Sequence, residues 1–192
     1  MARYQLTLAY NGTGFFGSQR QAKSRTVQGE LEKALQKLGW TGRSVILAGR
    51  TDTGVHAIGQ VASADLEWSH LEGDLLNALN AELPADLAVH RVRMVQAKFH
   101  PRFDAISRCY RYRLFCQPLR DPIREPFAWR VWPAINSDVL ATTASHFLGT
   151  HDFSAFGSPT TPKGTTVRTV MKAEWMQARD AKDEWHFEVQ AD

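Results

Sequence analysis

One short segment of the chain carries the side chains best suited to nucleophilic chemistry: Arg50, Asp52 and His56. It follows an apolar run at residues 45–48, and glycines at positions 49 and 54 would allow a tight loop. Asp52 is the only acid of the segment, and a neighbouring guanidinium favours the ionised form of a carboxylate, which a nucleophile requires. An arginine–aspartate pair can also simply brace a turn, so the spacing leaves a catalytic and a structural role equally open.

A glycine-rich segment at residues 12–17 satisfies the pattern G-x-G-x-x-G after a strand-like run, as in dinucleotide-binding loops. That pattern requires a helix to begin at once, so that its N-terminus faces the pyrophosphate. Here residues 18–25 are polar and basic, and helical periodicity starts only at Val27. We therefore expect no nucleotide cofactor. We interpret the loop as a surface that contacts a nucleic-acid backbone through Gln19, Arg20, Gln21 and Lys23.

A third pattern alternates aromatic and basic residues over positions 108–113. In a strand, the period of two places Arg108, Tyr110 and Tyr112 on one face. Arg111 and Arg113 then lie on the other face. Aromatic rings can stack on bases while arginines hold phosphates, so the pattern is typical of an RNA-binding strand. Ordinary packing of tyrosines in a half-buried strand would produce the same alternation.

Two other kinds of chemistry are excluded by spacing. His151, Asp152 and Ser154 are hydrolase-type residues, but neighbours in a chain cannot all point to one centre, and no G-x-S-x-G elbow exists. The seven histidines show no i, i+3 or i, i+4 pair on a helix, and Cys109 and Cys116 lack metal-site spacing. We therefore expect no metal and two free thiols.

The charge of the chain is nearly balanced but unevenly distributed. Twenty-three Lys and Arg against twenty Asp and Glu give a net charge of +3. Basic residues cluster between Arg91 and Arg113, where Asp104 is the single acid, and again at residues 20–25. Such clusters favour a polyanionic partner, although a solvated basic face is equally compatible with them. No apolar run is long enough to cross a bilayer and no secretory signal is present, so we expect a cytoplasmic protein.

Hydrophobic periodicity predicts an α+β protein with two halves. In residues 1–105 the order β-α-β-β-α-β matches a ferredoxin-like unit, whose two helices cover one face of an antiparallel sheet. Its expected strands are 4–10, 45–48, 59–66 and 87–95, and its helices are 27–38 and one opened by a capping box at 69–72. Residues 106–192 should form a second domain with strands 107–115, 167–175 and 185–189 and a helix at 138–148. With one clear helix, this domain is expected to be incomplete at its C-terminal end.

Eight groups of segments together resemble the TruA-type tRNA pseudouridine synthases, from the first strand to the last residue. They run in the family's order: 10–13 with 16–17 and 19–21, 26–32, 49–52 with 54–57, 79–80 with 83–84, 103–105, 108 with 110–112, 149–154 and 167–170. Any one of them is weak, but eight in the right order are highly specific. The resemblance implies two ferredoxin-like halves with antiparallel sheets that flank a central basic cleft for RNA.

The resemblance also implies an activity: isomerisation of uridine to pseudouridine at positions 38 to 40 in the anticodon stem-loop of tRNA, without metal or cofactor. Asp52 matches the family's nucleophile, which attacks either the ribose or the uracil ring. Tyr110 matches a tyrosine that stacks on the target base and helps to remove its carbon-5 proton. Arg50 matches an arginine that helps to extrude and hold the nucleotide. Family members are homodimers whose joint basic cleft holds one tRNA.

Further substrate-binding residues are expected at the following positions: Gln19, Arg20, Gln21, Lys23, His56, Arg102, Phe103, Arg108, Arg111, His151, Phe153 and Arg168. The sequence also departs from the family pattern. Ser18 stands where the family often has Trp, which removes a stacking or packing ring from the loop. The chain ends at Asp192, before the family's Met-Val-Arg segment, whose arginine pairs with the catalytic aspartate. The alternative is therefore a noncatalytic RNA-binding protein or an inactive truncated homologue.

Overall fold

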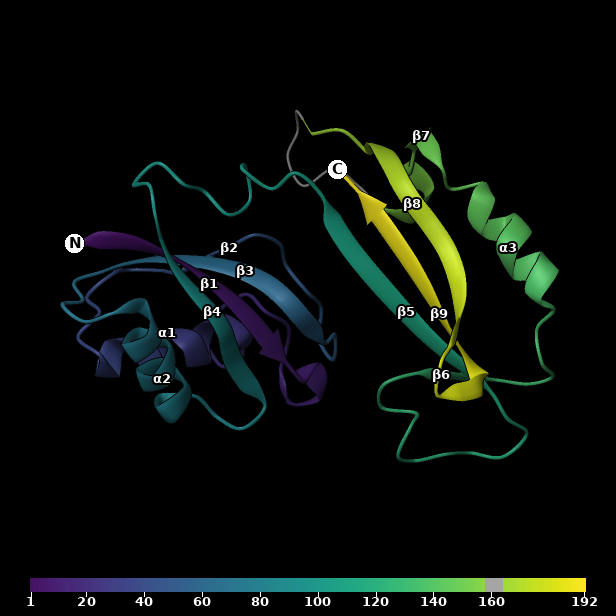
Figure 1. Ribbon diagram of the computed structural model, residues 1–192, viewed down its shortest axis with the longest axis horizontal. Coiled ribbons are helices and arrows are strands. Elements are labelled where there is room, and N and C mark those ends of the chain that lie inside the picture. The colour runs from purple at the N-terminus through teal and green to yellow at the C-terminus, as the bar shows by residue number, and fades with distance from the viewer. Residues whose placement is uncertain (158–163) are drawn as a thin grey trace. The chain divides into compact units, whose positions relative to one another are not determined.

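The chain forms two compact units in the computed structural model, which describes residues 1–157 and 164–192. The first unit is Met1–Ala105 and the second is Ile106–Asp192. Each unit has its own sheet (Figure 1). One sheet is antiparallel and the other is mainly so, and three α-helices accompany them among the described residues. The protein is therefore of the α+β class, as predicted.

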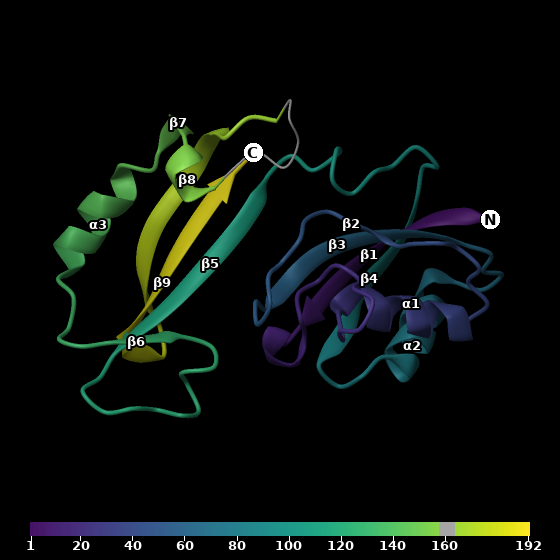
Figure 2. The ribbon, with the colours of Figure 1, turned by 180° about the vertical axis from the view of Figure 1, so that it is seen from behind.

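The first unit is a four-stranded sheet with two helices on one face (Figure 1, Figure 2). Its strand order is β2-β3-β1-β4, and every pairing is antiparallel. The strands are β1 (Ala2–Tyr10), β2 (Ile46–Leu47), β3 (Ala57–Leu66) and β4 (Leu87–Val95), and the helices are α1 (Val27–Lys37) and α2 (Glu72–Glu82). The elements follow one another in the order that the periodicity predicts.

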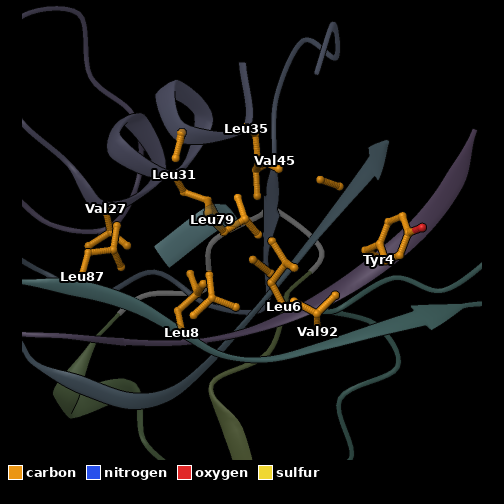
Figure 3. Close-up of a cluster of buried hydrophobic side chains, with 14 of the residues drawn as sticks. Tyr4, Leu6, Leu8, Val27, Leu31, Leu35, Val45, Leu79, Leu87 and Val92 are labelled. Atoms are coloured by element: carbon orange, nitrogen blue, oxygen red, sulfur yellow. The ribbon is translucent and has the colours of Figure 1, made fainter. Parts of the chain in front are cut away.

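The core of this unit lies between the sheet and the two helices (Figure 3). Alternate residues of β1, Leu6 and Leu8 among them, point into it. The helical positions Val27, Leu31 and Leu35 meet them from α1, as the i, i+4 spacing predicts. All five side chains are at most 1% exposed, and burying one of them contributes roughly 1.5–3 kcal/mol. This packing fixes α1, and with it the loops on either side of the helix.

Helix α2 begins at a different residue from the one predicted. Its first helical residue is Glu72, and Leu71 occupies the N-cap position. The Leu71 N–H donates to the Asp74 carboxylate (3.1 Å), three residues further on. The capping box predicted at Ser69 is therefore wrong, because the acid that reaches back to the helix start is Asp74 and not Glu72.

The second unit is a five-stranded sheet in the order β6-β5-β9-β8-β7, with one helix beside β8 (Figure 1). Its elements are β5 (Arg108–Cys116), β6 (Trp129–Val131), α3 (Ser137–Ser145), β7 (Gly149–Asp152), β8 (Val167–Ala178) and β9 (Ala181–Ala191). β6 pairs with β5 in parallel, and the other pairings are antiparallel. The short strands β6 and β7 are absent from the sequence-based prediction. Over the described ranges 1–157 and 164–192, no helix is both long and apolar enough to cross a membrane.

The register of the second sheet separates aromatic from charged residues, as predicted for β5. Tyr112 lies opposite Phe187, whereas Arg111 lies opposite Glu188 and donates to its carboxylate through Nε (2.9 Å). Tyr110, on the same face as Tyr112, is 51% exposed, and Tyr112 is 70% exposed. Neither tyrosine is therefore packed in a core of this unit among the described residues.

Candidate active site

The Asp52 loop, defined as residues 49–56, lies between β2 and β3. Arg50 and Asp52 are both exposed, and Gly54 has a φ of +82°, the left-handed conformation that favours glycine in a turn. No ion pair joins Arg50 to Asp52 in the part of the chain that the structure describes. The pair that both interpretations of the spacing invoked, catalytic and bracing, is therefore not formed here, so this geometry favours neither of them.

Thr51, between these two residues, is held by all of its polar groups. Its carbonyl oxygen accepts the Ser18 N–H (2.9 Å), and its own N–H donates to Ser18 Oγ (2.8 Å). Its hydroxyl lies 2.9 Å from the Tyr10 hydroxyl. Burial raises the pKa of the Tyr10 phenol, so the phenol remains protonated at neutral pH. The loop is thus fixed at the residue directly before Asp52.

The glycine-rich segment packs against the same loop. A Cβ on Gly12 would lie 2.1 Å from the Val55 carbonyl oxygen, so no other residue fits there without moving the backbone. Gly17, with a φ of +82°, would bring a Cβ within 2.9 Å of the Thr51 carbonyl oxygen. The Gly12 N–H also donates to His56 Nδ1 (3.1 Å). These glycines therefore support the Asp52 loop by close backbone approach, which accounts for the pattern without a nucleotide.

Arg25, at the C-terminal end of the loop that contains the glycine-rich segment, is held by two contacts. Its guanidinium donates two hydrogen bonds of 2.7 Å to the Asp86 carboxylate and lies 4.3 Å from the centre of the Phe15 ring. The Asn11 N–H donates to the Asp86 carbonyl oxygen (3.0 Å). The pKa of Asp86 is lowered, chiefly because Arg25 donates to the charged carboxylate. This pair ties both ends of the segment to the turn before β4.

Asp86→Asn is expected to make stability less dependent on pH in acid. A carboxylate with a lowered pKa in the folded state stabilises the fold above its unfolded-state pKa of about 4, and this contribution is lost as pH falls through the folded-state value. The two side chains are 36% and 32% exposed, so the contribution is about 1 kcal/mol or less. Urea unfolding should find the variant less stable than wild type at pH 7 and equally stable near about pH 2. The same difference in free energy of unfolding between wild type and variant at both pH values would contradict this pH dependence. Glu67→Gln, at an exposed acid, is the control.

A buried polar network connects the glycine-rich segment to α1. Glu32, whose side chain is 4% exposed, accepts hydrogen bonds from Arg20 Nη1 (2.7 Å), Gln28 Nε2 (2.9 Å) and the Val45 N–H (2.9 Å). Gln28 Oε1 accepts the Arg20 N–H (2.9 Å). One turn of α1 thus fixes the loop at residue 20 and the approach to β2 at residue 45.

Of the binding residues predicted in the first unit, some are exposed to solvent and others are hydrogen-bonded within the protein. Gln19 and Lys23 are exposed, as a backbone-contacting surface requires. Arg20 is half-exposed but engaged with Glu32, and Gln21 Nε2 donates to the Phe16 carbonyl oxygen (2.6 Å). Both of these polar groups therefore already hold the loop together. His56 is half-buried at the end of the Asp52 loop, where it accepts from Gly12.

Arg102 and Phe103 lie near the end of the first unit and are exposed. The Phe103 ring is 76% exposed and stacks on His100, with 4.2 Å between ring centres. Their exposure leaves both side chains accessible to a ligand.

In the second unit, His151 and Phe153 form part of an aromatic cluster that continues to β9. Their rings are 6.1 Å apart, and Phe153 stacks on Phe147 at 6.4 Å. His151 Nε2 lies 2.8 Å from the Leu148 carbonyl oxygen. Arg168 is exposed on β8, across from His151 in the register, and Arg108 is half-buried at the start of β5.

The sequence prediction missed two residues of the Asp52 loop's support, Tyr10 and Ser18. Tyr10 was available as the last residue of the alternating first strand, but its contact with Thr51 spans 41 positions. Ser18 was interpreted as the loss of a ring, whereas it is 0% exposed and bonded to Thr51. Among the described residues, no group of three or more His, Cys, Asp or Glu side chains could hold a metal ion.

Comparison with known proteins assigns the chain to a family. A family model described as tRNA pseudouridine synthase matches residues 7–104 and 143–192. This chain therefore belongs to the tRNA pseudouridine synthase family, as its resemblance predicts. The match includes the Asp52 loop and β7 to β9 but not residues 105–142, which contain Tyr110.

The relatives of this chain carry a more specific name, tRNA pseudouridine synthase A. The protein of that name from Shouchella clausii (strain KSM-K16) is 42% identical over 171 residues, which are 88% of this chain and 66% of the relative. The one from Paraburkholderia xenovorans (strain LB400) is 37% identical over 191 residues, 100% of this chain and 70% of the relative. The one from Chloroflexus aurantiacus (strain ATCC 29366 / DSM 635 / J-10-fl) is 44% identical over 186 residues, which are 93% of this chain and 66% of the relative. The chain thus spans about two thirds of these relatives' length.

Proposed function

We propose that this protein is an isomerase that converts uridine to pseudouridine in the anticodon stem-loop of tRNA, at positions 38 to 40. The observation that carries the proposal is the exposed Asp52 carboxylate on a loop fixed at Thr51 by Ser18 and Tyr10. A nucleophile must be accessible to the reacting atom and held in one place, and this loop meets both requirements. The family membership supplies the substrate class.

The proposed reaction is an internal rearrangement that needs no net oxidant or reductant. The bond between uracil nitrogen 1 and the ribose breaks, the base rotates, and a bond from its carbon 5 to the same ribose carbon forms as the carbon-5 proton leaves. Asp52 forms a transient covalent bond, either to the ribose or to the uracil ring. Tyr110 stacks on the base and assists removal of the proton. Arg50 helps to extrude and hold the nucleotide, because a base inside a stacked stem is out of reach.

The proposal extends to the organisation of the protein. Residues 1–105 form the ferredoxin-like domain that carries the catalytic loop, and residues 106–192 form a second domain of the same kind that contributes Tyr110. The enzyme acts without a cofactor as a cytoplasmic homodimer. Its basic surface for RNA includes Arg91 and Arg93, which are exposed on β4.

The test is a pseudouridine assay on unmodified tRNA transcripts, with the chain of 192 residues and with any longer form of the protein. Pseudouridine at positions 38 to 40, and its absence from transcripts with cytidine there, is the expected result. Binding of tRNA without isomerisation by either form would replace the proposal with a noncatalytic RNA-binding role. Loss of both binding and isomerisation in a folded protein would overturn the substrate assignment.

The affinity for tRNA is expected to fall steeply with added salt. Each phosphate neutralised by Lys or Arg contributes about 0.7–0.9 to the slope of log K against log salt concentration. Arg91→Gln removes one exposed cation of β4 and should reduce the slope by about one. Filter binding from 50 to 300 mM salt, about the range usual for such titrations, measures this. Arg179→Gln, at an exposed arginine in the β8–β9 turn, is the matched control, and binding that does not respond to salt would argue against phosphate contacts.

A further inference from the structure

Ser18 binds the backbone of Thr51 through two of its own groups. The Ser18 N–H and hydroxyl satisfy the carbonyl and the N–H of Thr51, at 2.9 and 2.8 Å. A residue bonded at both backbone groups by a single neighbour has little freedom in φ and ψ. The next residue is Asp52, so fixing the backbone of Thr51 also restricts where the backbone of Asp52 can lie.

The two residues that hold Thr51 are buried and anchored in the core. Ser18 is 0% exposed and Tyr10 is 5% exposed, whereas Thr51 itself is half-buried. The Ser18 carbonyl oxygen accepts the Gln28 N–H of α1 (2.9 Å). Tyr10 is the last residue of β1, and its ring packs edge-on against Phe15. Thr51 is therefore fixed from a helix on one side and from a central strand on the other.

We propose that Ser18 and Tyr10 are positioning residues for Asp52: they lock Thr51, and the locked Thr51 holds the Asp52 carboxylate in the one place from which it attacks. The inference rests on the proposed role of Asp52. It also assigns a task to Ser18, a position where the sequence pattern indicated only the loss of an aromatic ring.

A positioning role differs from a merely structural one in what its loss changes. Loosening the Asp52 loop should slow the chemical step, because displacing a reacting group by about 1 Å can lower a rate about a hundredfold. It should leave binding of tRNA intact, because the exposed basic side chains are untouched. A merely structural role would instead lower stability, and with it the fraction of active enzyme, without altering the turnover of the folded molecules.

The experiment measures kcat and KM for tRNA in Ser18→Ala and Tyr10→Phe of the longest natural form of the protein. Both variants should lower kcat by about tenfold to a hundredfold and keep KM within about twofold. Tyr10→Phe keeps the buried ring, so it tests the hydroxyl alone if Ser18→Ala fails to fold. The matched controls are Tyr4→Phe, an equally buried ring on the same strand, and Ser69→Ala, an exposed serine. Both controls should retain wild-type kcat.

Thr51 provides a rescue within the same contact. Thr51→Val keeps the shape of the side chain but removes the hydroxyl that meets Tyr10, so kcat should fall as in Tyr10→Phe. Thr51→Ser keeps the hydroxyl and should recover most of the activity lost in Thr51→Val. Equal activity of the valine and serine variants would overturn the role of the Tyr10 contact.

Hydrogen exchange supplies a readout that does not depend on activity. The Thr51 amide donates to Ser18 Oγ, so it should exchange about tenfold faster in Ser18→Ala, while amides of the α1 core keep their rates. Wild-type kcat and exchange in Ser18→Ala, together with an inactive Asp52→Asn, would overturn this inference and leave the proposed function standing. An active Asp52→Asn would instead remove the proposed function on which the inference rests.

Discussion

Asp52→Asn is expected to lower pseudouridine formation by at least about a thousandfold, because an amide oxygen cannot replace a carboxylate as the covalent nucleophile. The substitution keeps the size of the side chain and leaves Thr51, Ser18 and Tyr10 in place. Binding of tRNA should stay within about threefold of wild type, since affinity comes mainly from phosphate contacts. Single-turnover assays with enzyme in excess separate the chemical step from binding.

The control for this variant is Asp180→Asn, the same substitution in the exposed β8–β9 turn, which should be fully active. An Asp52→Asn enzyme that retains a tenth or so of wild-type activity would show that Asp52 is not the nucleophile, because covalent catalysts lose far more. Deamidation of the new asparagine would restore the wild-type residue, so the mass of the purified variant should be checked before and after the assay.

Glu32→Ala is expected to destabilise the first unit by about 1–3 kcal/mol, the usual loss when a buried donor is left without its acceptor, because the partner Arg20 is itself half-exposed. Glu32 accepts from Arg20, Gln28 and the Val45 backbone, so its loss leaves a buried N–H without this acceptor. The glycine-rich segment and the approach to β2 would both loosen. Denaturant unfolding followed by hydrogen exchange of the α1 core amides reports the change in the first unit.

Glu82→Ala is the matched control, because Glu82 ends helix α2 of the same unit and pairs with exposed Lys37 at the surface. Its loss should amount to about 1 kcal/mol or less. Similar losses in the two variants would show that the buried network contributes no more than a surface pair. A Glu32→Gln variant, which retains an oxygen acceptor, should fall between wild type and Glu32→Ala.

The parts of the fold that follow from local pattern were predictable. The i, i+4 spacing from Val27 placed α1, and Gly39, with a φ of +87°, follows its C-cap Leu38. Strand β1 follows from its alternation. The strands β6 and β7, of three and four residues, were not predictable, because such short strands form only through pairing with β5 and β8. The start of α2 was misplaced because two acids competed for one capping position.

In the candidate site too, one part could be predicted from the sequence and another could not. The residue types of the Asp52 loop and the alternation of β5 are compatible with nucleophilic and RNA-binding chemistry, and the resemblance to the family selects that interpretation. The partners of those residues do not follow from sequence: Arg20 was expected to face RNA, and its guanidinium pairs with Glu32. A charged side chain on a loop can turn either to solvent or to a buried acid, and only the packing of α1 determines which.

The sequence alone determined the residue chemistry and the family, because the types and order of residues in the matching segments are local properties of the chain. The tertiary structure alone determined that Ser18 and Tyr10 hold Thr51. Those bonds join residues 33 and 41 positions apart, and no periodicity or motif connects such distant positions. Their pairing arises because packing α1 and β1 into one core brings the glycine-rich segment against the Asp52 loop.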